Sequence, residues 1–391
     1  MKRLVPIVLA SAVNLQLGCS STPENLDIVI TPENSTTADM LVRKTEEGVR
    51  PARVIEWQHF FKTHPTSTEV LQLKQQIKNL NKKETMTFDQ ILTLARAERA
   101  VGELEKSEVT YRTLIRKNSD NFDANIELAQ VFLEKNQVSL AFDYLTASNK
   151  ILKSQETPAK TDLYRYKYTL AIGMQATNRI DEARRMLSDL ISNQRDFILA
   201  YQALAHSYLN ESKYDLAEFI ANRGIERTES HAPLLNVLGI VREKRGELAR
   251  ATEYYNKALK QNPNLVAALV NRANLSIRKS EYDAAESDLK NAITNGPYFA
   301  NAYISMGVLY QRTGRFTSAK SFFEKALSIR PENAYARYNL ASLYDKEFEN
   351  PNKALRLYYE VVQSSDKTDE IKELALIQIQ GLRDSRISLN K

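Results

Sequence analysis

The sequence of 391 residues is poor in the residue types that interrupt helices and in those that form covalent cross-links. Glycine and proline number only 11 each, and cysteine occurs once. Glycine and proline end helices and populate turns, so their scarcity over this length favours a mostly helical chain. A single cysteine excludes a disulfide within the chain.

Signatures of catalysis and of nucleotide binding are also missing. The sequence has no G-x-G-x-x-G fingerprint, no P-loop and no G-x-S-x-G elbow. Its histidines are His59, His64, His206 and His231. His59 and His64 do not have the spacing that places a metal-binding pair on one helical face. We therefore expect no catalytic residue, no metal, no cofactor and no small-molecule substrate, and hence no enzyme.

The charge balance does not single out a nucleic-acid partner. Basic residues number 54 and acidic residues 48, so the formal net charge is +6, and the two signs are interspersed. A mild, scattered excess supports solubility but provides no basic surface of the kind that binds nucleic acid. Hydrophobic residues make up 43% of the chain, which is enough to build a folded core.

The N-terminus has the anatomy of an export signal. Lys2 and Arg3 precede a mostly apolar stretch over residues 4–17. That stretch is shorter than the ~20 residues that cross a bilayer, which is typical of a signal peptide. We predict a signal peptide over residues 1–18.

The end of this segment, Leu17-Gly18-Cys19-Ser20, resembles the lipobox of bacterial lipoproteins. Gln16 departs from the family pattern, which usually has Leu or Val there, so an ordinary secretory signal with an incidental cysteine stays open. The resemblance implies that Cys19 carries the lipid. Because Ser20 is not the aspartate that retains such proteins in the inner membrane, it also implies an outer membrane lipoprotein facing the periplasm of a Gram-negative cell.

A repeat of 34 residues runs through the rest of the chain. One unit contains Leu238-Gly239, Gly246, Ala251, Tyr255, Ala258 and Pro263. A later unit has its matching residues 68 positions further on, at Met306-Gly307, Gly314, Ala319, Phe323, Ala326 and Pro331. The unit between them holds Ala273, Tyr282, Ala285, Leu289, Ala292 and Pro297. Units in this frame begin near Phe88, Phe122, Tyr164, Ile198, Ala232, Val266, Ala300 and Ala334.

This pattern resembles the tetratricopeptide repeat, whose signature has small residues at positions 8, 20 and 27. The resemblance implies an all-α superhelix (an α-solenoid) of about eight to nine helix-turn-helix repeats, with a turn near position 15 at Gly246 and Gly314. A lone repeat cannot bury its apolar faces, so neighbouring repeats must complete the core. Thr87 and Gln90 have the spacing of a helix capping box.

The frame divides the chain into segments. We predict a flexible tether over 19–50, an N-terminal helical half-repeat over 51–87, a first repeat block over 88–155, a joint over 156–163, a second block of six repeats over 164–367, and a C-terminal capping helix over 368–391. The joint accounts for eight extra residues around Pro158.

In tetratricopeptide arrays the first helix of each pair lines a concave groove through positions 2, 5, 6, 9, 12 and 13. We predict a partner-binding groove at Asn236, Ile240, Lys244, Val270, Asn271, Asn274, Arg278, Asn301, Ile304, Val308, Arg312, Tyr335, Tyr338, Asn339 and Lys346. Asparagines both donate and accept hydrogen bonds, which suits a peptide backbone.

Position 13 is basic in four successive repeats and forms a basic column of Lys244, Arg278, Arg312 and Lys346. Such a column suits an acidic segment or a carboxylate. The other interpretation is that each cation stabilises the last turn of its helix through the helix dipole, whatever the partner.

The resemblance implies a scaffold that binds protein partners in the cell envelope and is held at the membrane by its N-terminal lipid. One hypothesis is support for the assembly of an envelope machine, such as a type IV or Tad pilus secretin or a gliding-motility complex. The second is an adaptor that regulates peptidoglycan hydrolases or synthases.

Overall fold

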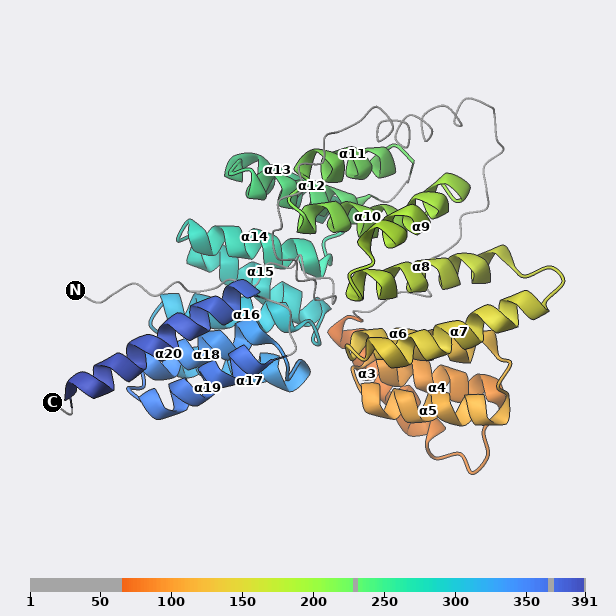
Figure 1. Ribbon diagram of the computed structural model, residues 1–391, viewed down its shortest axis with the longest axis horizontal. Coiled ribbons are helices and arrows are strands. Elements are labelled where there is room, and N and C mark those ends of the chain that lie inside the picture. Colours follow the sequence, from red (N-terminus) through yellow and green to blue (C-terminus); the bar gives the residue numbers. More distant parts are fainter. Residues whose placement is uncertain (1–64, 228–230, 365–368, 390–391) are drawn as a thin grey trace.

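The computed structural model describes residues 65–227, 231–364 and 369–389 (Figure 1). The predicted signal peptide, Cys19 and the tether lie outside the described residues. In those ranges the chain is helical and contains no strand, which confirms the predicted all-α class. The helices are α3 (Ser67–Leu80), α4 (Phe88–Ala100), α5 (Leu104–Lys117), α6 (Phe122–Glu134), α7 (Val138–Ser154), α8 (Lys160–Ala176), α9 (Ile180–Asn193), α10 (Ile198–Asn210), α11 (Tyr214–Ile225), α12 (Ala232–Lys244), α13 (Leu248–Gln261), α14 (Val266–Arg278), α15 (Tyr282–Asn295), α16 (Ala300–Arg312), α17 (Phe316–Ile329), α18 (Ala334–Lys346), α19 (Pro351–Gln363) and α20 (Asp369–Leu389).

The helices form pairs in the expected frame. The first helix of a pair begins at the residue where a 34-residue unit starts in every repeat except one. The exception is α8, which begins at Lys160, four residues before Tyr164. Helices α7 and α8 each have 17 residues, so they take up part of the extra sequence, and only residues 155–159 remain between them. The predicted capping box is present, because the side chains of Thr87 and Gln90 cap each other's backbone N–H groups.

The turn inside each pair requires a left-handed backbone at position 15. Positive φ angles occur at Gly102, Asn136, Asn178, Ser212, Gly246, Ser280, Gly314 and, after one inserted residue, Glu349. The next residue then closes the helix end: the N–H of Glu247 donates to the carbonyl of Arg242 at 2.9 Å, which is the six-to-one bond of a Schellman motif. The same backbone geometry therefore recurs whether or not glycine is present.

The two helices of a repeat approach closely where position 8 is small. A Cβ atom added at Gly307 would lie 2.5 Å from Cε1 of Phe323, and one added at Gly239 would overlap the ring of Tyr255. Both rings are fully buried, as are Ala251 and Ala319 on the facing helices. Each glycine thus makes the space that an aromatic ring of its own repeat fills.

Successive repeats are joined by polar contacts from position 21 of one unit to the first helix of the next unit or to the turn that follows that helix. Glu286 accepts hydrogen bonds from Tyr310 at 3.1 Å and from Arg315 at 2.9 Å. Hydrogen bonds from Lys290 and Arg315 lower the pKa of Glu286 to about 2. In an earlier unit the charges are exchanged: Arg184 reaches Glu211 at 2.9 Å. These contacts set the register between neighbours along the array.

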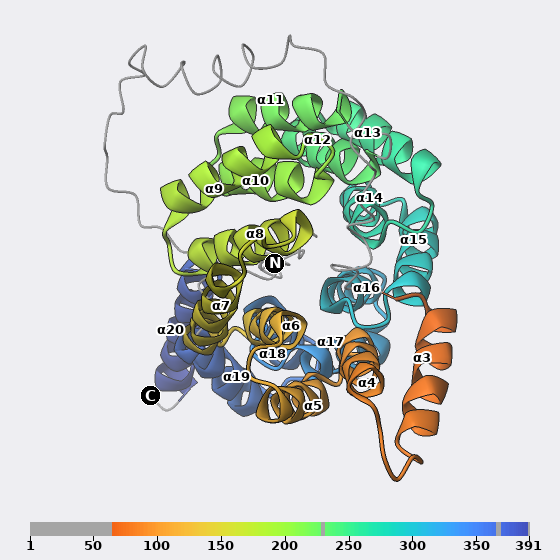
Figure 2. The ribbon, with the colours of Figure 1, turned by 90° about the vertical axis from the view of Figure 1, so that its right-hand side faces the viewer.

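The pairs are arranged around a ring when the molecule is viewed from one end (Figure 2). The even-numbered helices α8, α10 and α14 lie nearer the centre than their partners α9, α11 and α15 (Figure 2). Even-numbered helices also pack on the next even-numbered helix, from α6 and α8 to α16 and α18. The first helices therefore form the concave side of the superhelix. None of the described helices is long and apolar enough to cross a membrane.

We predict that Gly239→Ala and Gly307→Ala each lower the free energy of unfolding by ~1–3 kcal/mol, because the new methyl group displaces a packed ring. Gly381→Ala on α20 is the matched control, since an added Cβ meets no atom within 4 Å there. That control should be neutral or stabilising by up to ~1 kcal/mol. Urea denaturation of the three variants measures this, and equal effects at all three positions would contradict the close-approach argument.

Candidate functional site

The structure places the predicted groove residues on four successive first helices, α12, α14, α16 and α18. Most of these side chains are buried. Val270, Ile304, Val308 and Tyr338 have an exposed fraction of 0%, and the asparagines have 1–4%. The amide of Asn271 donates to the amide oxygen of Asn236 at 3.0 Å, which links α14 to α12. Binding of a partner at these residues stays a prediction.

The basic column is the exposed edge of this surface. Lys244, Arg278 and Arg312 are exposed, and Lys346 is half-buried. Arg278 forms an ion pair with Glu243 of the preceding repeat at 2.9 Å, and Glu243 also accepts a hydrogen bond from Tyr255 at 2.8 Å. Because 45% of the Arg278 side chain stays exposed, its guanidinium is available to a ligand while this contact orients it.

The concave side of α4, α6 and α8 has a different character, because it carries a network of buried and half-buried charges. Glu127 lies at its centre. It accepts three hydrogen bonds from Arg96, at 3.1, 2.8 and 2.5 Å, one from Arg165 at 3.0 Å and one from the hydroxyl of Tyr111 at 2.8 Å. Arg165 also donates to Asp123 at 2.6 Å. The network therefore ties three successive repeats together.

The carboxylate of Glu127 stays ionised in spite of its burial. Its exposed fraction is 4%, and burial alone would raise its pKa. The hydrogen bonds and positive charges of Arg96 and Arg165, with the hydrogen bond from Tyr111, outweigh burial and hold the pKa of Glu127 below its ordinary value. A second branch runs from Arg99 to Glu134 at 2.9 Å and to Gln130 at 2.7 Å.

Sequence reasoning missed this network although the register could have located it. Arg96, Asp123, Glu127 and Arg165 occupy positions 9, 2, 6 and 2 of their repeats, all of which are groove positions. The predicted groove residues come only from the regular units that begin at Ala232. The same positions in the weaker N-terminal units mark the charged half of the concave side.

Some buried side chains of the described first helices hold polar atoms without a hydrogen-bond partner. Two of these atoms are Nδ1 of His206 on α10 and the hydroxyl of Tyr338 on α18. Burial lowers the pKa of His206 to about 4, so its imidazole is neutral near pH 7. Burial also raises the pKa of Tyr338 to about 12. Buried polar atoms of this kind gain most from a partner that supplies hydrogen bonds.

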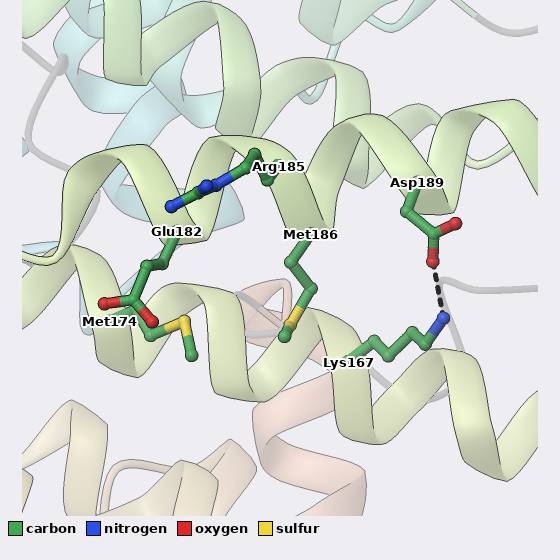
Figure 3. Close-up of a pocket in the computed structure, with 6 residues that line it drawn as sticks. All are labelled: Lys167, Met174, Glu182, Arg185, Met186 and Asp189. Carbon is green, nitrogen blue, oxygen red and sulfur yellow. Dashed lines mark hydrogen bonds and ion pairs between the residues drawn. The ribbon is translucent and has the colours of Figure 1, made fainter.

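A shallow hollow of about 310 Å³ lies between α8 and α9 (Figure 3). Met174 and Met186 supply its apolar lining, and Lys167 and Asp189 form a hydrogen-bonded ion pair at one end. Glu182 and Arg185 complete the lining. Methionine side chains adapt to irregular apolar groups, so the hollow suits an aliphatic side chain. Its lining contains no pair of nucleophile and base.

The described residues also contain no group of three or more His, Cys, Asp or Glu side chains that could hold a metal ion.

Comparison with protein families finds the tetratricopeptide repeat. One family model with that description matches residues 300–333, and a second matches residues 92–150, 202–266 and 236–298. These segments fall on α4 to α7 and on α10 to α17, in the frame that the 34-residue spacing predicts.

Curated relatives share segments of limited length with the chain. Human protein O-mannosyl-transferase TMTC3 is 28% identical over 173 residues, which is 43% of this chain and 19% of that protein. Small glutamine-rich tetratricopeptide repeat-containing protein 2 of Mycosarcoma maydis is 32% identical over 92 residues, which is 24% of this chain and 26% of that protein. The chain thus spans about a quarter or less of each relative, and neither match assigns that protein's activity to it.

Among solved structures, the APC/C hetero-tetramer Cut9-Hcn1 has a similar fold. The TM-score is 0.51 at 18% sequence identity, and the alignment covers 81% of this chain and 60% of that chain. At this identity the likeness concerns the fold alone. It agrees with the helix pairs and repeat spacing described above.

We predict that Glu127→Gln lowers the free energy of unfolding by ~3–5 kcal/mol, because it leaves Arg165 buried without its central counter-charge. Glu105→Gln is the control. Its side chain is 82% exposed and lies 3.9 Å from Lys135, so it should cost less than ~0.5 kcal/mol.

The pH dependence has a defined sign. A carboxylate whose pKa is lowered by folding stabilises the protein above its unfolded pKa of ~4.3, and this contribution disappears as pH falls through the folded pKa. The free energy of unfolding of Glu127→Gln should therefore lie furthest below that of the wild type near neutral pH. The difference between the two free energies should become smaller as the pH falls. Urea denaturation at several pH values measures it. A constant difference across the acid range would contradict the assignment.

Proposed function

We propose that the chain works as a scaffold for other proteins, because it is a tetratricopeptide repeat protein with the fold of a protein–protein interaction scaffold. It binds its partners on the concave side of the superhelix. It acts from the periplasmic face of the outer membrane of a Gram-negative cell, where a lipid on Cys19 anchors it, and it supports the assembly of an envelope machine such as a pilus secretin or a gliding-motility complex.

The concave side supports the binding part of this proposal. It joins a charged half around Glu127 to a half rich in asparagine, aliphatic and tyrosine side chains, with exposed cations at Arg278 and Arg312 along its edge. Side chains of this mixture can hold both the backbone and the charged groups of a polypeptide. The observation that carries the proposal is the alignment of these side chains on successive first helices.

The location rests on the N-terminal sequence. A short positive head, an apolar stretch and Leu17-Gly18-Cys19-Ser20 resemble the start of a bacterial lipoprotein. An anchored array supplies a fixed point in the envelope from which a groove can hold an assembling partner. A fixed point of this kind suits the assembly of a larger complex, and for this reason we favour an assembly scaffold. The alternative function, a peptidoglycan adaptor, is distinguished from it by the capture experiment below.

We predict that Cys19→Ser moves the protein from the membrane pellet to the soluble fraction after osmotic lysis and leaves the melting temperature unchanged. The thiol is the attachment point of the lipid, so radiolabelled palmitate should enter the wild type and not the variant. Detergent-free fractionation and fluorography measure the two effects. Equal pelleting of both proteins without any lipid label would contradict the anchor.

We predict that Arg278→Glu combined with Arg312→Glu weakens partner capture from detergent-solubilised envelopes. The melting temperature should change little, since a surface ion pair such as Arg278–Glu243 contributes only ~0–1 kcal/mol. The control is Arg250→Glu combined with Arg356→Glu, an equal charge change at two exposed sites on the second helices α13 and α19.

Mass spectrometry of the captured proteins separates the outcomes. Secretin, pilus or motility components that are retained by the control and lost from the Arg278 and Arg312 variant support the assembly scaffold. Wall hydrolases or synthases with the same dependence favour the peptidoglycan adaptor. Equal capture by both variants would contradict partner binding by the basic column. It would favour the other interpretation, in which each cation stabilises the last turn of its helix.

A further inference from the structure

The N-terminal helices α3 and α4 contact the far side of the superhelical turn. Tyr298, in the corner between α15 and α16, packs against an apolar cluster of α3 and α4. The hydroxyl of Ser67 donates to the carbonyl of Thr294 at 2.6 Å, across 227 positions of sequence. Figure 2 shows α3 beside α15 and α16, where the ring of helices closes. The cluster consists of Val70, Ile77, Leu80, Leu94, Ala97 and Val101.

Tyr298 departs from the residue type of its repeat position. It stands at position 33, where the other units carry polar residues such as Asp196, Asn264 and Glu332. The packing inside a repeat therefore does not require an aromatic ring at this corner. The contact with the first repeat gives the ring its apolar surroundings.

Gly102 forms the surface that receives this ring. Its φ is +76°, and a Cβ atom there would lie 2.8 Å from Cδ1 of Tyr298. Gly246 and Gly314 hold the same turn position with φ of +79° and +73°, and an added Cβ would meet nothing within 4 Å at either. All three glycines thus have the left-handed backbone of this turn, but only at Gly102 does a neighbouring side chain leave no room for a Cβ atom.

We propose that Tyr298 and Gly102, together with the Ser67–Thr294 hydrogen bond, form a latch that joins the two ends of the superhelical turn. Opening of the latch widens access to the concave side. In a solenoid each repeat packs mainly on its neighbours, so small shifts distributed over several interfaces can separate the two ends. A contact of one ring and one hydrogen bond is small enough to leave an open state populated at about 0.1–10%.

The separation of α3 from α15 tests the latch directly. The full chain with Cys19→Ser receives cysteines at Gln76 and Asn291, two exposed positions on these helices, for spin or dye labels. The substitution Gly102→Asn places a side chain in the space that the ring of Tyr298 occupies. Asparagine tolerates the backbone of this turn, because Asn136 has φ of 57° at the same position of the next repeat. Gly246→Asn is the matched control.

We expect Gly102→Asn to shift most of the distance distribution to longer separations, and Gly246→Asn to reproduce the wild type. Tyr298→Asn, which installs the residue type of Asn264, should act like Gly102→Asn. Far-UV circular dichroism checks that each variant is folded. Equal distributions in folded Gly102→Asn, Tyr298→Asn and Gly246→Asn proteins would overturn the latch.

Access to the concave side is measured without any partner, so it does not depend on the proposed function. A cysteine at Arg278, on the exposed concave edge of α14, in the chain without other cysteines, is alkylated with a polymer-linked maleimide. If alkylation follows the open population, opening a latch that is about 10% open raises the rate about tenfold in Gly102→Asn and leaves Gly246→Asn unchanged. Longer separations with an unchanged alkylation rate would overturn the role of the latch in access.

Discussion

The close approach of the two helices within a repeat is the constraint on which the rest of the structure depends. At Gly239 and Gly307 the first helix has no side chain, and Tyr255 and Phe323 occupy the space. This packing fixes each pair as a unit, which presents its remaining faces to the neighbouring pairs. Polar contacts such as Glu286 with Tyr310 and Arg315 then set the register between units. Curvature follows, and with it a concave side built from first helices.

Much of the fold could be predicted from the sequence because the repeat encodes it locally. The unit starts at Phe88, Ile198 and Ala300 are the first residues of α4, α10 and α16. Helix pairing needs only contacts within one unit and its neighbour, and those recur every 34 residues. The early start of α8 at Lys160 was not predicted, because an insertion can lengthen helices or loops and the 34-residue pattern does not distinguish the two.

The concave side was predicted only in part. The asparagine and cation positions were located by register, but their burial depends on how tightly the superhelix winds. The network of Glu127, Arg96 and Arg165 lies in units with weak signatures, and its pairings join residues about 30–40 positions apart. The Tyr298–Gly102 contact depends on the twist accumulated over several repeats, which no local pattern contains. The 34-residue pattern thus predicts the helix pairs. The contacts between distant pairs depend on the twist that accumulates over several repeats.

The central claim is that partners are held on the concave side. Site-specific photo-crosslinking in intact cells tests it most directly, with a photoreactive amino acid placed at Arg312 on α16 or at Arg356 on α19. Both side chains are exposed, but they lie on a first helix and a second helix, respectively. The account predicts a discrete protein adduct from position 312 and none from position 356. An adduct from position 356 alone would contradict it.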